Sequence, residues 1–407
     1  MITTINNKHK KLNVPNLRFP EFEEEWEESS IGEMFDLYSG NTPSRLNKEH
    51  FKGAVNWISS GELKDHYIYS SKEQISEEAA KNLKLLPVGT FVIAIYGLEA
   101  EGVRGTGSIT QEPSTISQAC MSFIPKGVIE NEFLYSWYKK HGNVIGIRYA
   151  QGTKQQNLSY DILEKFRIAY PNTKEQEKLN KFISLLDKRI ATQNKIIEDL
   201  KRLKSAISKH LCSRKDLLET TIRLADIATL KNGYAFQSRK YDTQGKWKIL
   251  TIANVSGERY INDDDCNCII NLPNDIQDHQ VLKEGDILIS LTGNVGRVSL
   301  CKAGNNLLNQ RVGLLCITKN VNQEFLYQVL SSRRFENSMV ACGQGAAQMN
   351  ISKGDVENFV LPYSSNANNI HLVARILHSY DECIINEQQE LTLLIMQKQY
   401  LLRQMFI

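Results

Sequence analysis

Side chains able to bond the edges of nucleic-acid bases gather in short polar loops, and the pattern occurs once in each half of the chain. Arginine, asparagine and glutamine can each make two hydrogen bonds to one base edge, so these residue types fit sequence readout. In the first half the candidate residues are Asn41, Thr42, Ser44, Arg45, Arg104, Gln118, Lys154 and Gln155. In the second half they are Arg239, Asn294, Arg297, Gln310, Arg311, Gln344 and Gln348. One such loop could be an ordinary turn, but a set that recurs favours a ligand surface, and the differences between the copies fit two domains that read different sequences.

Sequence motifs of catalysis and of cofactor binding are missing from the chain. There is no GxxxxGK[ST] phosphate loop, no HExxH or GxSxG motif and no N-P-P-[FY] tetrapeptide. Residues 263–265 are three successive aspartates, which cannot all face one ion and are interpreted as a solvated turn. The eight cysteines include no CxxC pair, which predicts reduced thiols and no metal site. We therefore expect a protein without a catalytic site, a metal or a bound cofactor of its own.

An internal repeat with a period near 193 residues organises the whole chain. The tripeptide FLY at residues 133–135 recurs at 325–327, and NLS at 157–159 returns as NIS at 350–352. A period of this length is too long for a solenoid. It indicates two homologous domains, each followed by its own copy of a second element.

That second element is a long helix with a heptad pattern. Ten positions, spaced alternately by four and three residues, are apolar in eight cases and polar at the same two steps in both copies. They are Leu179, Ile183, Leu186, Ile190, Gln193, Ile197, Leu200, Lys204, Ile207 and Leu211, and then Val373, Leu377, Tyr380, Ile384, Glu387, Leu391, Leu394, Lys398, Leu401 and Met405. Because the ends of a domain usually lie close together, the second helix begins near the end of the first and must run back along it. The pattern therefore predicts an antiparallel coiled coil.

The predicted fold class is α+β, with two homologous α/β-type domains joined by a long antiparallel two-helix coiled coil and related by a pseudo-two-fold axis. Short β-like runs such as 91–96 and 287–291 alternate with Gly, Asn and Ser turns and with helical stretches such as 132–140 and 324–333. Residues 364–369 are expected to form a loose connector. The predicted boundaries are 1–171 for the first domain, 172–213 for the central helix, 214–363 for the second domain and 364–407 for the C-terminal helix.

The net charge of +3 is unevenly distributed along the chain. Residues 172–214 carry 11 Lys and Arg against 5 Asp and Glu, a net of +6, so the rest of the chain sums to −3. A polyanion or an acidic partner would therefore meet local basic patches. The helix cations that lie off the heptad seam, and that we expect to bind a partner protein, are Lys178, Lys181, Lys188, Arg189 and Lys195. The chain has neither an apolar run long enough for a membrane helix nor an apolar N-terminal region, which predicts a cytoplasmic protein.

Several local motifs, together with the repeat, make the chain similar to the specificity subunit of type I restriction–modification systems. They are the opening VPNLRFPEF at 14–22, the Gly-x-Thr-Pro-Ser loop at 40–44, and Pro171 shortly before the Glu-Gln pair at 175–176. The second copy lacks the Thr-Pro of the loop and the Glu-Gln pair after Pro362. The resemblance nevertheless covers essentially the whole chain.

The resemblance implies two target-recognition domains that read a bipartite, asymmetric site in double-stranded DNA, and two helical spacers. Two modification subunits are expected to clasp the coil and to carry S-adenosylmethionine, while restriction subunits carry ATP and Mg²⁺. The specificity subunit itself is expected to perform no chemistry. Two other classes stay open from the sequence: a stand-alone DNA-modifying enzyme with an unrecognised motif, and a coiled-coil adaptor with two protein-binding heads.

Overall fold

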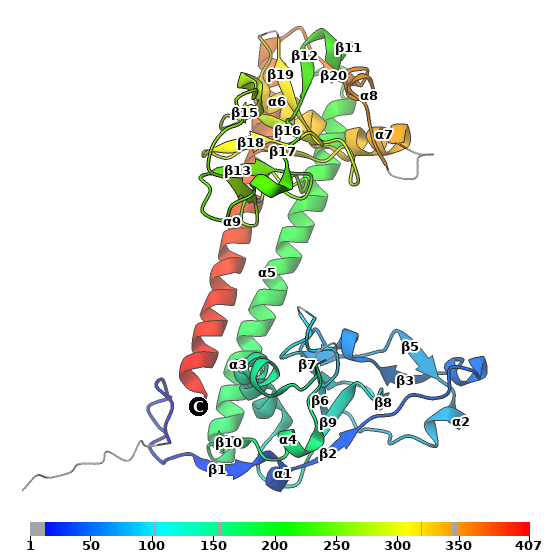
Figure 1. Ribbon diagram of the computed structural model, residues 1–407, viewed down its shortest axis with the longest axis vertical. Helices are drawn as coiled ribbons and strands as arrows, with labels where there is room; N and C mark the ends of the chain where they lie inside the picture. The colour runs from blue at the N-terminus through cyan, green and yellow to red at the C-terminus, as the bar shows by residue number, and fades with distance from the viewer. Residues whose placement is uncertain (1–12, 101, 153–155, 319, 344–348) are drawn as a thin grey trace, which may run out of the picture. The chain divides into compact units, whose positions relative to one another are not determined.

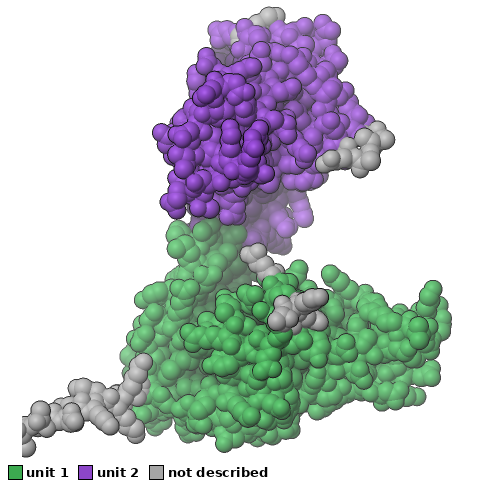
Figure 2. Space-filling view, in the orientation of Figure 1, with its two compact units in different colours: residues 1–192, 391–407 green, residues 193–390 purple. Residues whose placement is uncertain are grey.

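The computed structural model describes residues 13–100, 102–152, 156–318, 320–343 and 349–407. The chain divides into two compact units, one of residues 1–192 with 391–407 and one of residues 193–390 (Figure 2). Each unit contains one sheet domain and one part of each of two long helices, α5 (Thr173–Ser213) and α9 (Ala367–Met405). The chain therefore passes from one unit to the other only within its two longest helices.

The first unit is built on a sheet with strand order β2-β9-β6-β7-β4 (Figure 1). Its strands are β2 (Phe35–Ser39), β9 (Cys120–Pro125), β6 (Phe91–Ala94), β7 (Gly107–Thr110) and β4 (Tyr67–Ile68). Because successive side chains of a strand point to opposite faces, Phe91 packs with helix α3 (Asn131–Tyr149), whereas Val92 packs toward a second sheet. That second sheet has the order β5-β3-β8 and consists of β5 (Glu73–Ile75), β3 (Val55–Ile58) and β8 (Ser114–Ile116). The main sheet is thus buried on both faces.

The second unit repeats this architecture, which confirms the predicted pair of homologous domains. Its main sheet has the order β12-β19-β16-β17, formed by β12 (Ala228–Asn232), β19 (Val312–Ile317), β16 (Ile287–Ser290) and β17 (Val298–Leu300). Its second sheet has the order β14-β13-β18-β15, formed by β14 (Asn267–Ile269), β13 (Trp247–Leu250), β18 (Asn306–Leu308) and β15 (Val281–Leu282).

One difference between the units lies in the helix that covers the main sheet. Where the first unit has the single helix α3, the second has α6 (Gln323–Leu330) and α7 (Arg333–Gly343). The helix expected over 324–333 therefore ends at Leu330. The reason is a serine pair at 331–332: the Ser332 hydroxyl accepts a hydrogen bond from the Phe335 amide and so caps a new helix.

A two-stranded antiparallel ribbon closes each domain next to a long helix. In the first unit β1 (Glu27–Ser30) pairs with β10 (Arg167–Tyr170), and α5 begins three residues after Tyr170. In the second unit β11 (Thr220–Arg223) pairs with β20 (Val360–Tyr363) in the same way. The remaining short helices are α1 (Ile31–Met34), α2 (Glu77–Ala80), α4 (Tyr160–Leu163) and α8 (Lys353–Glu357).

The two long helices pack antiparallel within each unit, as predicted. In the first unit Asp187 of α5 pairs with Lys398 of α9. In the second unit Lys204 of α5 pairs with Asp381 of α9 at 2.5 Å, and Gln193 bonds the main-chain carbonyl of Glu387. The number on one helix rises as its partner's number falls, which defines the antiparallel direction. All twenty predicted seam positions are buried or half-buried, and the polar steps are hydrogen-bonded or ion-paired.

The expectation of a loose connector at 364–369 is wrong. Ser364 is 2 % exposed, and the amide and hydroxyl of Ser365 both bond the Glu219 carboxylate. Helix α9 already begins at Ala367, because Asn366 accepts a hydrogen bond from the Asn368 amide. The polar composition of this segment serves helix capping and an anchoring contact rather than slack.

Three general findings concern membranes, metals and cysteines. Of the helices in the described part of the chain, none is long and apolar enough to cross a membrane. The described residues also contain no group of three or more metal-ligating side chains that could hold an ion. All eight cysteines are free thiols.

Asp263, interpreted from the sequence as part of a solvated turn, instead pairs with Lys248 and Lys302 at 2.6 and 3.1 Å.

Candidate nucleic-acid interface and its anchorage

The structure brings the predicted polar loops of the first unit together at one edge of its main sheet. Strand β2 ends, β9 begins and β6 ends at this edge, because each neighbouring pair is antiparallel. Main-chain hydrogen bonds then join the loops in series: Asn41 donates to the carbonyl of Ile116 at 3.1 Å, and Ile95 donates to that of Ala119 at 2.9 Å. The last link runs from the Leu98 amide to Gln156 at 3.0 Å.

The second unit assembles its loops in the same order. The Gln310 amide donates to the carbonyl of Tyr234, and the Leu291 amide to that of Arg311, both at 3.0 Å. The Gly293 amide donates to Met349, also at 3.0 Å. Residues that are up to about a hundred positions apart in sequence thus form one continuous loop cluster in each unit.

Two glycines at repeat-matched positions permit this close approach. A Cβ atom on Gly40 would lie 2.0 Å from the carbonyl oxygen of Ile116, and one on Gly233 would lie 2.2 Å from that of Asn309. Any other residue would push the first loop away from its neighbour. Glycine is therefore required here by the contact between the loops.

Arg45 of the first unit is already engaged. Its guanidinium forms a two-pronged ion pair with Glu73, both N–O distances being 2.7 Å, and lies 4.3 Å from the ring centre of Phe51. The Glu73 carboxylate raises the pKa of Arg45, and the side chain remains more than half exposed. The pair with Glu73 uses one donor on each terminal nitrogen of Arg45, so its Nε–H and outer N–H groups remain able to bond a base or a phosphate. The Asn41 side chain accepts from the Thr42 amide, and Ser44 is exposed.

Arg104 holds its own loop together. Its guanidinium donates to the main-chain carbonyls of Leu98 and Glu99, and its stem packs beside Gly146. Its position predicts a role in shaping the loop more than in direct base contact. Gln118 is exposed at the neighbouring loop. Lys154 and Gln155 lie outside the described residues.

In the second unit Arg311 is the most available of the predicted arginines. It is exposed, and none of the described carboxylates pairs with it. Arg297 lies 3.8 Å from the Glu336 carboxylate, and Arg239 bonds the Gln237 side chain at 3.0 Å. Asn294 and Gln310 are exposed in the same loop cluster, and Gln344 and Gln348 lie outside the described residues.

The cations predicted to bind a partner all lie on the exposed side of α5. Lys181, Lys188, Arg189 and Lys195 are exposed. Lys178 is also exposed but pairs with Glu21 and lies 4.5 Å from the ring centre of Phe19.

Sequence reasoning missed the partly buried charge cluster that fixes each loop domain to the long helices. In the first unit His66 stacks on Tyr135, with ring centres 3.9 Å apart, and its Nε2 lies 2.9 Å from Glu132. Its Nδ1 lies 3.3 Å from Asp187 of α5, and Asp187 also binds Lys398 of α9. One imidazole thus connects the domain to both helices.

The second unit has the same cluster with arginine in place of histidine. Arg259 donates to both oxygens of Glu324 at 2.7 and 2.8 Å and to Asp381 at 3.0 Å. Its guanidinium lies 5.1 Å from the ring centre of Tyr327, and Lys204 completes the set. The repeat period relates each residue to its counterpart in the first unit. The sequence signal that could have revealed the cluster is the recurrence of charged residues at repeat-matched positions. It was missed because one position is histidine, His66, and its match is arginine, Arg259.

The imidazole makes the first cluster sensitive to pH. Burial disfavours the charged form of His66, but the carboxylates of Asp187 and Glu132 outweigh burial and raise its pKa. A raised pKa means that charged His66 stabilises the folded unit fully below the unfolded value of about 6.5. This stabilisation is lost as the pH rises through the pKa of the folded state.

We therefore expect His66→Arg, which installs the residue type of the second unit, to reduce the pH dependence of stability. The unfolding temperature of the wild-type first unit should fall between about pH 6 and about pH 9 more steeply than that of the variant. Differential scanning calorimetry over this range makes the comparison. Parallel pH profiles for the two proteins would contradict a charged His66.

The chain contains two repeated sheet domains, and each carries one polar loop cluster. Each domain is also fixed by charged side chains to the antiparallel pair of long helices. This arrangement defines a protein with two matched recognition heads. The chain belongs to the family of the type I restriction modification DNA specificity domain, whose model matches residues 23–202 and 219–394. The sequence-based recognition of this family is confirmed.

Related proteins and solved structures agree with this family assignment. The chain is 28 % identical over 192 residues to the type I restriction enzyme MjaIX specificity subunit of Methanocaldococcus jannaschii, covering 46 % of this chain and 43 % of that protein. It is 24 % identical over 376 residues to the MjaVIII specificity subunit of the same organism, covering 85 % and 83 %. The chain thus spans less than half of the first relative and most of the second.

The fold is shared with the S subunit of a type I restriction–modification system from M. genitalium. The TM-score is 0.56 at 17 % identity, covering 97 % of this chain and 99 % of that one. A structure from a study of complex assembly and conformational transition of the type I R-M system gives 0.57 at 15 % identity, covering 93 % and 96 %. These likenesses concern the fold, and they support the α+β architecture with two domains and two long helices.

Proposed function

We propose that this specificity subunit reads a bipartite, asymmetric site in double-stranded DNA, with one half-site assigned to each loop cluster. The observation that carries the proposal is that the two clusters are assembled from the same loops in the same order but from different side chains. Scaffold contacts such as Gly40 against Ile116 and Gly233 against Asn309 are repeated. Side chains at matching loop positions nevertheless differ: at the repeat period of 193 residues Arg45 matches Ser238 and Arg311 matches Gln118, whereas Arg104 matches Arg297. Two domains that share a main-chain scaffold but present different side chains to the bases recognise two different DNA sequences.

The chain itself supplies specificity, and partner subunits supply the chemistry. The relatives are named as specificity subunits, which supports a role without catalysis. We assign S-adenosylmethionine to two modification subunits that dock on the long helices, and ATP with Mg²⁺ to the restriction subunits. The exposed α5 cations, among them Lys188 and Lys195, are suited to bind an acidic surface of a modification subunit. The complex is expected to work in the cytoplasm, where its DNA lies.

The test is reconstitution with the modification subunit encoded by the same system. The complex should retard duplex DNA that carries the host's methylated site, and the isolated chain should not bind radiolabelled S-adenosylmethionine. Cofactor binding by the isolated chain would favour the stand-alone enzyme. A complex that binds no duplex DNA would favour the adaptor.

Arg311→Ala tests the assignment of the second loop cluster. Arg311 is exposed and unpaired among the described residues, so we expect it to contact a base edge. Its truncation should cost about 1–3 kcal/mol of binding and relax one position of one half-site. Binding measured against a library of single-base variants gives this result. A uniform loss across all sequences would instead identify a phosphate contact.

Arg104→Ala is the matched control in the first unit. Because Arg104 bonds the carbonyls of Leu98 and Glu99, its loss should disturb a loop that serves the other half-site only. Altered preference in the half-site assigned to Arg311 would contradict the assignment of one half-site to each unit.

A further inference from the structure

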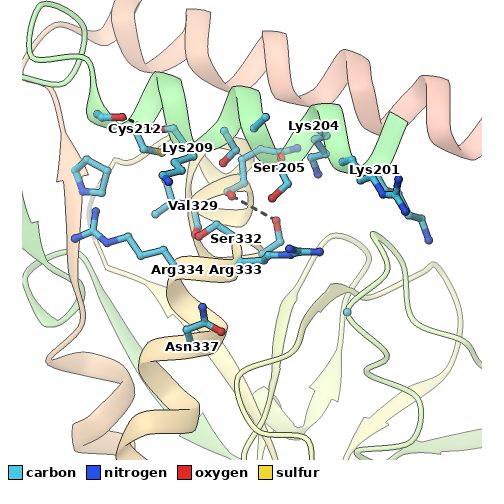
Figure 3. A pocket seen from close by; sticks show the side chains of 18 of the residues that line it. Lys201, Lys204, Ser205, Lys209, Cys212, Val329, Ser332, Arg333, Arg334 and Asn337 are labelled. Atoms are coloured by element: carbon cyan, nitrogen blue, oxygen red, sulfur yellow. Dashed lines mark hydrogen bonds between the residues drawn. The ribbon is translucent and has the colours of Figure 1, made fainter. Parts of the chain in front are cut away.

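A basic cavity lies in the second unit between the C-terminal part of α5 and the turn that joins α6 to α7 (Figure 3). Its volume is about 1130 Å³. One wall comes from α5, with Lys204, Ser205 and Lys209, and the opposite wall carries Arg333, Arg334 and Asn337 of α7. None of the residues that line the cavity is among those predicted to contact DNA, although Gly257 of the lining lies beside Arg297.

The charges around this cavity are strongly unbalanced. Six cationic side chains line it against the single carboxylate of Glu198. Lys204 is neutralised by Asp381 and Lys201 by Glu258. Lys209, Arg333 and Arg334, however, pair with none of the described carboxylates, although Arg334 donates to the main-chain carbonyl of Val360. The cavity therefore offers an acidic ligand three cations without a described counter-carboxylate, and two of them, Lys209 and Arg333, are also without a described hydrogen-bonding partner.

The first unit shows what fills the corresponding space there. Phe406, directly after α9, is 2 % exposed and packs on Phe133 with ring centres 5.2 Å apart. The main-chain carbonyls of Phe406 and Ile407 accept hydrogen bonds from Lys140 and His141. An aromatic side chain and the adjoining main chain thus close this place in the first unit.

The second unit has lost that filling. The helix repeat of 194 residues places Cys212 where the first unit has Phe406, and Ser208 where it has Leu402. On the opposite wall, Arg333 stands where the first unit has His141. Small side chains have replaced the bulky apolar ones, and the His141 imidazole, whose pKa burial lowers to about 4, is replaced by a cationic donor able to bond a carbonyl or a carboxylate. The space is accordingly open and basic.

From this comparison we infer that the cavity is a docking site for an extended acidic segment, carrying a bulky apolar side chain, of the modification subunit. The apolar side chain takes the place that Phe406 occupies in the first unit, against Cys212 and Val329. Carboxylates of the segment pair with Lys209 and Arg333. The inference rests on the proposed function, because it names where one of the proposed partners is held.

The shape of the site favours a peptide over the DNA backbone. A duplex presents a convex row of phosphates and has no bulky apolar group to fill a cavity of this size. Part of the lining is apolar, including Ala206, Cys212 and Val329, and such surface is buried by a side chain rather than by a phosphate. The first unit also shows that the matching place accommodates polypeptide.

Two kinds of full-length variant test the inference by different routes. The double variant Ser208→Leu with Cys212→Phe fills the cavity with the residues of the first unit and changes no charge. The double variant Lys209→Glu with Arg333→Glu reverses the two unpaired cations on the exposed rim. Lys215→Glu is the matched control, since Lys215 is an exposed cation of the same unit outside the cavity.

The measurement is the dissociation constant of each full-length chain for the purified modification subunit. The dissociation constant of both double variants should be at least about tenfold higher than that of the wild type, and that of Lys215→Glu should be unchanged. Undiminished capture by both double variants overturns the inference and leaves the proposed function intact. Intact capture with weakened DNA binding also overturns it, in favour of a phosphate site. If the wild-type chain captures no modification subunit, the proposed function itself fails.

A photo-cross-linking residue at position 209 identifies the occupant. In the assembled complex it should mark an acidic segment of the modification subunit that contains a bulky apolar residue. A cross-link to a basic segment or to DNA would contradict the stated chemistry. The filled variant should unfold at or above the wild-type temperature, which separates lost docking from lost folding.

Discussion

Replacing Arg259 with methionine should lower the free energy of unfolding of the second unit by about 3–5 kcal/mol. The guanidinium side chain is 6 % exposed and satisfies Glu324 and Asp381 at once. Methionine keeps much of the volume but leaves both carboxylates with one fewer counter-charge, and the Asp381 side chain is only 7 % exposed. Hydrogen exchange of amides in β16 and α6, against those of the first unit, measures the loss locally.

Arg259→His is the control for this prediction, because it copies the first unit. Near pH 6 the imidazolium should restore part of the stability, and near pH 9 the neutral ring should behave like methionine. A loss below about 1 kcal/mol for Arg259→Met would show that the cluster is replaceable and that the domain is held by its apolar contacts alone.

Inserting four helix-forming residues in both long helices should widen the gap between the half-sites without changing their sequences. The insertion points are between residues 192 and 193 of α5 and between 390 and 391 of α9, where each helix passes from one unit to the other. Four residues add about 6 Å and about 40° of rotation. One base pair adds about 3.4 Å, with about 10.5 pairs in a turn. The gap should therefore grow by about one or two base pairs.

The same insertion in α5 alone is the control. It shifts α5 against α9 on one side of the insertion, so contacts such as Asp187 to Lys398 and Lys204 to Asp381 cannot all form. We expect this variant to lose assembly. Methylated motifs of hosts carrying each variant give the answer, and an active double insertion with an unchanged gap would show that the helices do not set the spacing.

Periodic features of this fold could be predicted from the sequence because each depends only on the spacing of residue types along the chain. The heptad positions from Leu179 to Leu211 predict the contact line of a coiled coil, and the repeat predicts two domains without any knowledge of their contacts. The antiparallel direction followed from chain connectivity. The break between α6 and α7 was missed because it depends on two serines whose capping role shows only in the fold.

The candidate site could be predicted in outline only. Glycine and polar loops marked the clusters, but the engagement of Arg45 by Glu73 depends on two segments that the tertiary fold brings together. The cluster around His66 was missed for a related reason. Its members, Glu132 and Asp187, lie on different helices, and each alone resembles a surface charge.

The central claim is that each loop cluster reads one half of a divided site. Methylome sequencing of the host, with and without this gene, tests it most directly. We predict a methylated motif that depends on the gene and consists of two different specified parts separated by unspecified bases. A gene-dependent motif that is single and uninterrupted would contradict the assignment of two recognition heads.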